Sequence, residues 1–209
     1  MTAGRGAWIT LEGGDGSGKT TQADLLADWL EQSGHTVVRT REPGGSEVGT
    51  LIREIVLHHR GDIAPRAEAL LYAADRAHHV ATVVRPALAR GDVVLQDRYL
   101  DSSVAYQGAG RVLDPVEVRD LSLWAAEGAL PDLTVLLDLD PAEARTRLDS
   151  ADKPFDRLEA EKAEFHSRVR EAYLALAAAE PERFLVLDAA RAPEEIAEPI
   201  RRRVGALFD

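Results

Sequence analysis

The sequence predicts an α/β protein in which a five-stranded parallel sheet carries helices on both faces. Three observations lead to this fold class. Short apolar runs alternate with stretches of helical periodicity along the whole chain. A glycine-rich loop follows the first apolar run and precedes the first helical stretch. No repeat, low-complexity tract or linker divides the 209 residues, so we expect a single domain over residues 1–209.

Five short apolar runs are the expected strands. They cover residues 7–11, 37–38, 92–95, 133–137 and 184–187. Helices are expected over residues 20–32, 47–58, 66–90 and 193–207, and Pro86 should mark a kink or a boundary in the third. Two further helices should begin after Asp114 and Asp140. Each aspartate is followed by proline at the first helical position and glutamate at the third, which is typical of a helix N-terminus.

The composition narrows the functional classes. The net charge is −11, whereas a protein that binds the nucleic-acid backbone usually has a basic face, so no nucleic-acid partner is expected. Cysteine is absent, which excludes disulfides and thiolate chemistry. No apolar run approaches the roughly 18 residues of a membrane span, and no apolar signal segment opens the sequence. We therefore expect a cytoplasmic protein without a membrane partner.

The glycine-rich loop Gly13-Gly14-Asp15-Gly16-Ser17-Gly18-Lys19-Thr20 matches the phosphate-loop pattern G-x-x-x-x-G-K-[ST] in full. Glycines let successive N–H groups curl around an anion, and the N-terminus of the following helix adds a favourable dipole. Lys19 would neutralise the β- and γ-phosphates of ATP, and the Thr20 hydroxyl would ligate Mg²⁺. We expect the ATP contacts to extend from Gly13 to Thr21. The loop predicts triphosphate binding but does not name the acceptor.

The end of the third strand favours a kinase. A GTPase switch usually reads guanine with Asn-Lys-x-Asp, which cannot occur here because the chain has no asparagine. Asp97 is well placed to hold Mg²⁺, and Arg98 follows it where a hydrolase would need a water-activating carboxylate. An arginine beside the metal site indicates a second anion to be held, as in a kinase with a phosphorylated substrate. A simple salt bridge between Arg98 and Asp97 is the alternative.

Three further segments carry a family resemblance. They are REPGG at 41–45, LLYAADR at 70–76 and DRYLDSSVAYQ at 97–107. Together with the phosphate loop they closely resemble the thymidylate kinase family, over nearly the whole chain. The resemblance implies a P-loop NTPase fold with a short lid, and transfer of a phosphoryl group from ATP to dTMP, with Mg²⁺, to give dTDP for dTTP synthesis. It also implies a homodimer built by helix packing, for which Leu121, Leu123 and Trp124 are candidates.

Tyr72 and Arg76 lie four residues apart and share a helix face. An aromatic ring beside an arginine can stack on a base and donate to a carbonyl at its edge. The resemblance implies thymine as that base, since thymine offers an acceptor where cytosine offers a donor. It also implies that Arg98 holds the phosphate, with Arg41 nearby, and that Pro43 forms the pocket wall. Tyr106 would pack on the sugar. Ser103 and Gln107 would lie at the polar edge of thymine.

The mechanism needs charge rather than a base, because the dTMP phosphate, with a second pKa of about 6, is already a nucleophile at neutral pH. Asp15 is an anion beside a polyanion, so we expect it to face the acceptor, at the 3′-hydroxyl or at Mg²⁺. Some family members place an arginine at the position of Gly16, and this chain does not. We therefore expect Lys153 and Arg157, in a lid over about residues 149–157, to join Lys19, Asp15 and Arg98 in catalysis.

On the ATP side, the resemblance places Arg147 against adenine and Ala190 and Arg191 in the loop that closes over the base. Two alternatives remain open at this point. The chain could be another nucleoside monophosphate or deoxynucleoside kinase, or a catalytically silent module that binds nucleotide on the same fold.

Overall fold

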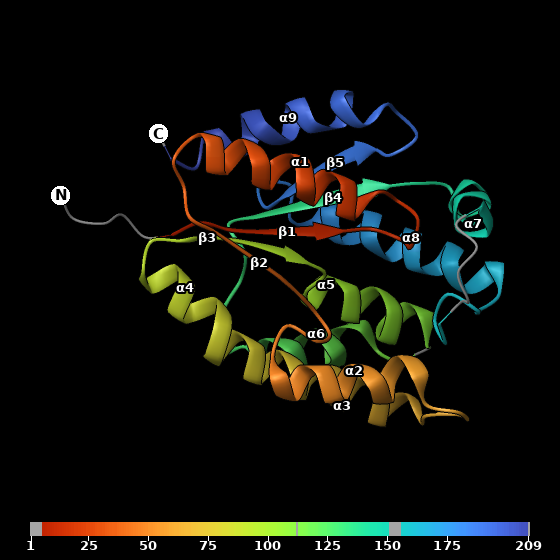
Figure 1. Cartoon of the computed structure of the whole chain (residues 1–209). Coiled ribbons are helices and arrows are strands. Elements are labelled where there is room, and N and C mark those ends of the chain that lie inside the picture. Colours follow the sequence, from red (N-terminus) through yellow and green to blue (C-terminus); the bar gives the residue numbers. More distant parts are fainter. Residues whose placement is uncertain (1–5, 112, 151–155, 209) are drawn as a thin grey trace.

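The computed structural model describes residues 6–111, 113–150 and 156–208, and it confirms the predicted five-stranded parallel sheet (Figure 1). The strand order is β2-β3-β1-β4-β5. The strands are β1 (Trp8–Glu12), β2 (Val37–Arg41), β3 (Val93–Asp97), β4 (Leu133–Asp138) and β5 (Phe184–Asp188). All neighbouring pairs are parallel. The carboxyl ends of the strands therefore share one edge, where ligands of open α/β sheets bind.

Helices cover both faces of the sheet. They are α1 (Lys19–Gln32), α2 (Glu47–His58), α3 (Pro65–His79), α4 (Arg85–Ala89), α5 (Leu100–Ser103), α6 (Pro115–Ala125), α7 (Pro141–Ser150), α8 (Ala163–Ala179) and α9 (Pro193–Gly205). On one face, apolar side chains of α1 and α9 pack on β1, β3 and β4. On the other face, α8 and the π-helical segment η2 (Val104–Gly110) pack with α2 and α3. Figure 1 shows these two layers above and below the sheet.

The helix expected over residues 66–90 is divided. A π-helical turn, η1 (Val80–Val84), separates α3 from α4, and the Arg85 N–H donates to the Val80 carbonyl. Pro86 lies in the first turn of α4, where its missing N–H costs nothing. The boundary predicted from Pro86 is thus present. The two aspartate caps are confirmed as well, because Asp114 accepts from the N–H of Val116 and Asp140 from that of Ala142.

The sequence patterns set no bounds for two helical stretches, namely α5 with η2 and the long α8. In η2 the backbone follows π-helical spacing, which the period of 3.6 residues does not detect. Within the part of the chain that the structure describes, no helix combines the length and apolar character needed to cross a lipid bilayer.

Candidate active site

The phosphate loop joins β1 to α1 and has the backbone expected of it. Gly13 and Gly18 have φ values of 134° and 92°, which side chains rarely adopt. A Cβ atom on Gly13 would lie 2.4 Å from the carbonyl oxygen of Leu137. Lys19 is 7% exposed, and its Nζ donates to the carbonyls of Gly13 (3.1 Å) and Gly14 (2.9 Å). Burial and the nearby Arg98 lower the pKa of Lys19.

Gly16 lies in the same loop with φ 78°. A Cβ atom there would be 2.9 Å from the carbonyl oxygen of Ala144 on α7 and 3.3 Å from the Leu148 side chain. A side chain at this position would therefore collide with α7 and would adopt an unfavourable φ. Both effects favour glycine here.

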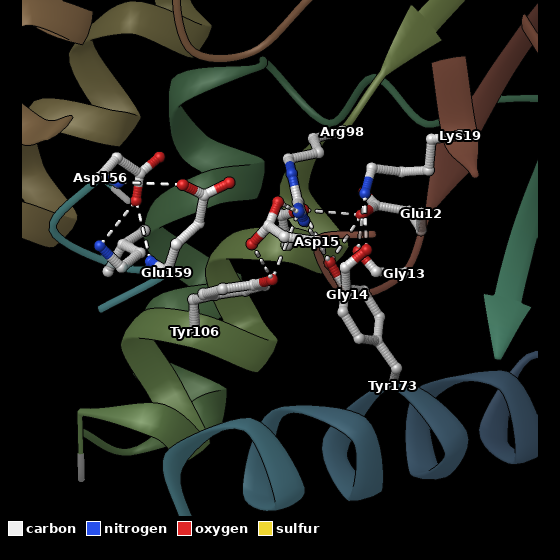
Figure 2. Close-up of polar contacts among 12 residues, drawn as sticks. Glu12, Gly13, Gly14, Asp15, Lys19, Arg98, Tyr106, Asp156, Glu159 and Tyr173 are labelled. Atoms are coloured by element: carbon white, nitrogen blue, oxygen red, sulfur yellow. Dashed lines mark hydrogen bonds and ion pairs between the residues drawn. The ribbon is translucent and has the colours of Figure 1, made fainter. Parts of the chain in front are cut away.

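Arg98 connects the loop to the rest of the site (Figure 2). It follows β3 with a positive φ of 65°, a strained conformation of the kind found at functional sites. Its Nη2 donates to Asp15 Oδ1 at 2.6 Å, and its guanidinium lies over the Tyr106 ring, 5.0 Å from the centroid. Nη1 donates to the hydroxyls of Ser102 (3.2 Å) and Tyr173 (3.3 Å). The alternative salt bridge to Asp97 is thus replaced by one to Asp15.

The pair of Arg98 and Asp15 is electrostatically matched. Burial would raise the pKa of Asp15, but Arg98 and Lys19 outweigh it and lower that pKa to about 2. Burial would likewise lower the pKa of Arg98, but Asp15 outweighs it and raises the pKa well above its ordinary value. Both groups are therefore charged at neutral pH. Asp15 Oδ2 also accepts from the Tyr106 hydroxyl at 3.3 Å, so both carboxylate oxygens bond to side chains outside the phosphate loop.

Next to this pair lies Glu12, which was not predicted from the sequence (Figure 2). It is fully buried, and its carboxyl group accepts from the Tyr99 N–H (2.7 Å) and from the hydroxyls of Ser102 (2.6 Å) and Tyr173 (2.8 Å). Burial and the nearby Asp101 raise the pKa of Glu12 to about 7. Glu12 holds two of the hydroxyl groups that receive Arg98, and so supports its position. An acidic residue at the end of an apolar strand was the available signal.

A cavity opens beside Arg98. It brings together most of the residues predicted to bind dTMP: Asp15, Pro43, Tyr72, Arg76, Arg98, Ser103, Tyr106 and Gln107. Arg41 does not line it. It lies instead at a second opening beside Lys19, Thr20 and Asp97. Arg53, which was not predicted, lines both openings and donates to the Pro43 carbonyl at 2.9 Å.

Arg76 is held rigidly in the wall of this cavity, with only 1% of its surface exposed. Its Nε pairs with Glu42 at 3.0 Å, and its terminal nitrogens donate to Ser122 (3.0 Å) and Ser103 (3.1 Å). His79 bonds the other oxygen of Glu42 at 2.9 Å. Ser103 thus contacts Arg76 directly in the cavity wall.

Asp75 is buried beside the same network. Its Oδ1 accepts from the Gly44 N–H at 3.1 Å, while Oδ2 has no hydrogen-bond partner among the described residues. Burial and the Glu42 charge raise the pKa of Asp75 to about 6.

Of the two cations expected in the lid, the structure describes only Arg157. Lys153 lies outside the described residues. Arg157 is engaged away from the phosphate loop: its Nε donates to the Val56 carbonyl at 2.9 Å, and it forms an ion pair with Glu68. The neighbouring Asp156 and Glu159 lie at the opening beside Lys19 and Arg98. Asp156 caps this turn by accepting from the N–H of Glu159 at 2.9 Å.

The residues expected on the ATP base side lie at the surface. Arg147 donates to the Ala189 carbonyl at 3.0 Å and to that of Gly16 at 3.4 Å, so it spans the phosphate loop and the loop after β5. Ala190 and Arg191 are exposed in that second loop. Of the metal candidates, Thr20 is exposed, and Asp97 has a buried Oδ1 without a hydrogen-bond partner among the described residues. Ser17 is buried and Thr21 exposed.

A parallel sheet with the order β2-β3-β1-β4-β5, a complete phosphate loop after β1, and a cation-lined cavity beside that loop define a P-loop nucleotide kinase. Comparison with known proteins makes this more specific. The family model "Thymidylate kinase" matches residues 11–200. The chain belongs to the thymidylate kinase family.

Relatives and a solved structure agree with this assignment. The chain is 76% identical to "Thymidylate kinase" of Clavibacter michiganensis subsp. michiganensis over 203 residues, which are 97% of this chain and 96% of the relative. It is 55% identical to "Thymidylate kinase" of Cutibacterium acnes over 98% of each chain. The crystal structure of thymidylate kinase from Ehrlichia chaffeensis superposes with a TM-score of 0.78 at 28% identity, covering 96% of this chain and 99% of that one.

Proposed function

We propose that this protein transfers the γ-phosphoryl group of ATP to the phosphate of dTMP, giving dTDP and ADP. One observation carries the proposal. Arg98 connects the phosphate loop, through Asp15, to a cavity that contains an aromatic ring, a buried arginine and a buried amide. A second anion bound at Arg98 would lie between Lys19 and the acceptor cavity, as an in-line transfer requires.

The acceptor would fill this cavity with its base away from the loop. Tyr72 would stack on thymine, Arg76 would donate to its O4, and Gln107 and Ser103 would lie at its polar edge. Pro43 would form a wall, and Tyr106 would pack on the sugar. Arg98 would hold the phosphate, with Arg41 and Arg53 contributing positive charge from the neighbouring opening.

The donor would bind on the loop from Gly13 to Thr21, with adenine between Arg147 and the loop of Ala190 and Arg191. Mg²⁺ suits the residues nearby. It keeps most of its water and needs only one or two carboxylates beside substrate phosphates. Asp97, with its unpartnered buried oxygen, and the exposed Thr20 hydroxyl would supply these contacts, with Asp15 as a further candidate. The bound ion would neutralise charge on the transferring group.

Acceptor-dependent ADP release tests the reaction. Purified protein with ATP and MgCl₂ is mixed with dTMP, dUMP, dCMP, dGMP or AMP, and ADP is measured by a coupled assay. We expect clear preference for dTMP. Preference for another monophosphate would contradict the acceptor assignment, and the absence of any acceptor-dependent ADP would favour the silent nucleotide-binding module.

Lys153 and Arg157 remain our candidates for the extra charge at the transferring group. Arg157 would have to leave Glu68 and the Val56 carbonyl to reach it. The Arg157→Ala variant should lose much more than threefold in turnover, since threefold corresponds to only about 0.7 kcal/mol. The matched control is Arg202→Ala, which removes an exposed arginine on α9. Turnover within threefold of the parent would exclude Arg157.

We also propose a homodimer in the cytoplasm. Large apolar side chains are exposed on three packed helices, including Leu51 on α2 (66%), Leu70 on α3 (57%) and Trp124 on α6 (79%). Of the face suggested by the sequence, Leu123 packs against the core instead, and only Trp124 is strongly exposed. Light scattering coupled to gel filtration should give twice the chain mass of 22.7 kDa. A Leu51→Glu variant should give the monomer mass.

A further inference from the structure

Glu68 is a buried carboxylate that the proposed chemistry does not use. It lies on α3, one turn before Tyr72, and its surface is 0% exposed. Burying a carboxylate is costly unless partners compensate it. Glu68 has three such partners, from segments far apart in the sequence: Gln107 on η2, Arg111 just after η2, and Arg157.

The contact with Gln107 determines how that amide is turned. Arg111 and Arg157 both direct guanidinium groups at Glu68, and a guanidinium can only donate, so the Glu68 carboxyl group serves its neighbours as a hydrogen-bond acceptor. The atom of Gln107 that lies 2.9 Å from Glu68 Oε1 must therefore be the amide nitrogen, Nε2. Consequently the carbonyl oxygen, Oε1, is the end of the amide that stays available.

That carbonyl oxygen belongs to a residue of the acceptor cavity. Gln107 lines the cavity with Tyr72 and Arg76 although only 1% of it is exposed. No group in the described part of the chain donates to its Oε1. The cavity thus presents a fixed acceptor from Gln107 and a fixed donor from Arg76, whose guanidinium is held by Glu42 and Ser103.

This pattern complements one type of pyrimidine. Thymine and uracil present an acceptor at O4 and a donor at N3–H, whereas cytosine presents a donor at its 4-amino group and an acceptor at N3. A fixed carbonyl therefore accepts from N3–H of thymine and opposes N3 of cytosine. We infer that Glu68 is a specificity-determining positioning residue, which fixes the amide of Gln107 so that the site selects 4-keto over 4-amino pyrimidines. This inference rests on the proposed acceptor site.

The Glu68→Gln variant tests it, because a neutral amide can donate as well as accept and so lets Gln107 turn over. The measurement is kcat/KM for dTMP and for dCMP in the ADP-release assay. We expect the ratio of the two to fall at least about tenfold, since a fixed hydrogen-bond pattern rejects a mismatched base far more strongly than an adaptable one. Glu161→Gln is the matched control. It makes the same change in another partner of Arg111, without touching Gln107, and should leave the ratio unchanged.

Glu68→Asp keeps the charge for both arginines and withdraws the carboxylate from Gln107 by one methylene group. It should also lower the ratio, and it covers the case in which Glu68→Gln does not fold. A ratio within twofold of the parent in a folded variant would overturn the inference. So would equal losses for both substrates together with a lower Tm, because Glu68 would then be merely structural.

The Gln107→Leu variant shows whether a negative result contradicts the role of Glu68 or the proposed function on which that role rests. If the parent shows no turnover of dTMP, the proposed function fails. If Gln107→Leu leaves the ratio as in the parent, the base is bound elsewhere and the acceptor site fails. If Gln107→Leu removes the preference while the Glu68 variants retain it, only the role of Glu68 is wrong.

Discussion

The buried carboxyl of Asp75 should make the protein less stable as the pH rises, and Asp75→Asn should remove this effect. The oxygen of the substituted amide would be able to accept from the Gly44 N–H as before, and no charge would remain beside Glu42. In the folded protein the pKa of Asp75 is about 6, against 3.8 for the ordinary group. The unfolded chain therefore releases this proton first. The stabilisation is complete below pH 3.8 and is lost as the pH rises through 6.

The size of the effect follows from these two pKa values. At about 1.36 kcal/mol per pKa unit, the difference in unfolding free energy between Asp75→Asn and the parent should grow by about 2 kcal/mol between about pH 4.5 and about pH 8. Urea unfolding measures this difference. The protein concentration is kept low because the isoelectric point of about 5.0 lies within this pH range, and a protein near its isoelectric point tends to aggregate. Asp28→Asn, on the exposed side of α1, makes the same change in net charge. A difference that is the same at both pH values, or that Asp28→Asn reproduces, would refute the reasoning.

Three further predictions concern packing, charge and metal. Gly49→Ala should destabilise the protein by about 1–3 kcal/mol in urea unfolding, because its Cβ would lie 2.2 Å from Asp75 Oδ1. Arg183→Ala should cost about 3–5 kcal/mol, since Arg183 pairs with the buried Asp101 at 2.7 and 2.8 Å; a loss below 1 kcal/mol, about that of a surface pair, would contradict this. Asp97→Asn should raise the MgCl₂ concentration for half-maximal activity at least about tenfold without lowering the Tm by more than a few degrees.

The strands and most helices were predictable because each leaves a local trace in the sequence. The phosphate loop at Gly13–Thr20, between a strand and a helix, and the aspartate caps at 114 and 140 can each be recognised from a few consecutive residues. The positions of Tyr72 and Arg76 on one helix face follow from helical spacing in the same way. Such features need no knowledge of the tertiary fold.

Hydropathy treats an acidic residue as exposed, so the partners of the buried carboxylates could not be predicted, although Glu12 left one local signal in its position at the end of an apolar strand. Glu12 and Glu68 are buried only because hydroxyl, amide and guanidinium groups from distant segments meet them. Arg157 was expected as a free lid cation for the same reason. Its partner Glu68 is 89 positions away in the chain, and no local pattern connects the two.

Because the Gly16 backbone meets α7, the phosphate loop is not an interchangeable module in this protein. Grafting an arginine at Gly16, after the relatives that carry one there, would force both an unfavourable φ and a displacement of the Ala144 carbonyl. In this protein, an arginine at Gly16 would therefore require a change in helix placement as well as in loop sequence. A designer who wishes to place an arginine at Gly16 must first move α7.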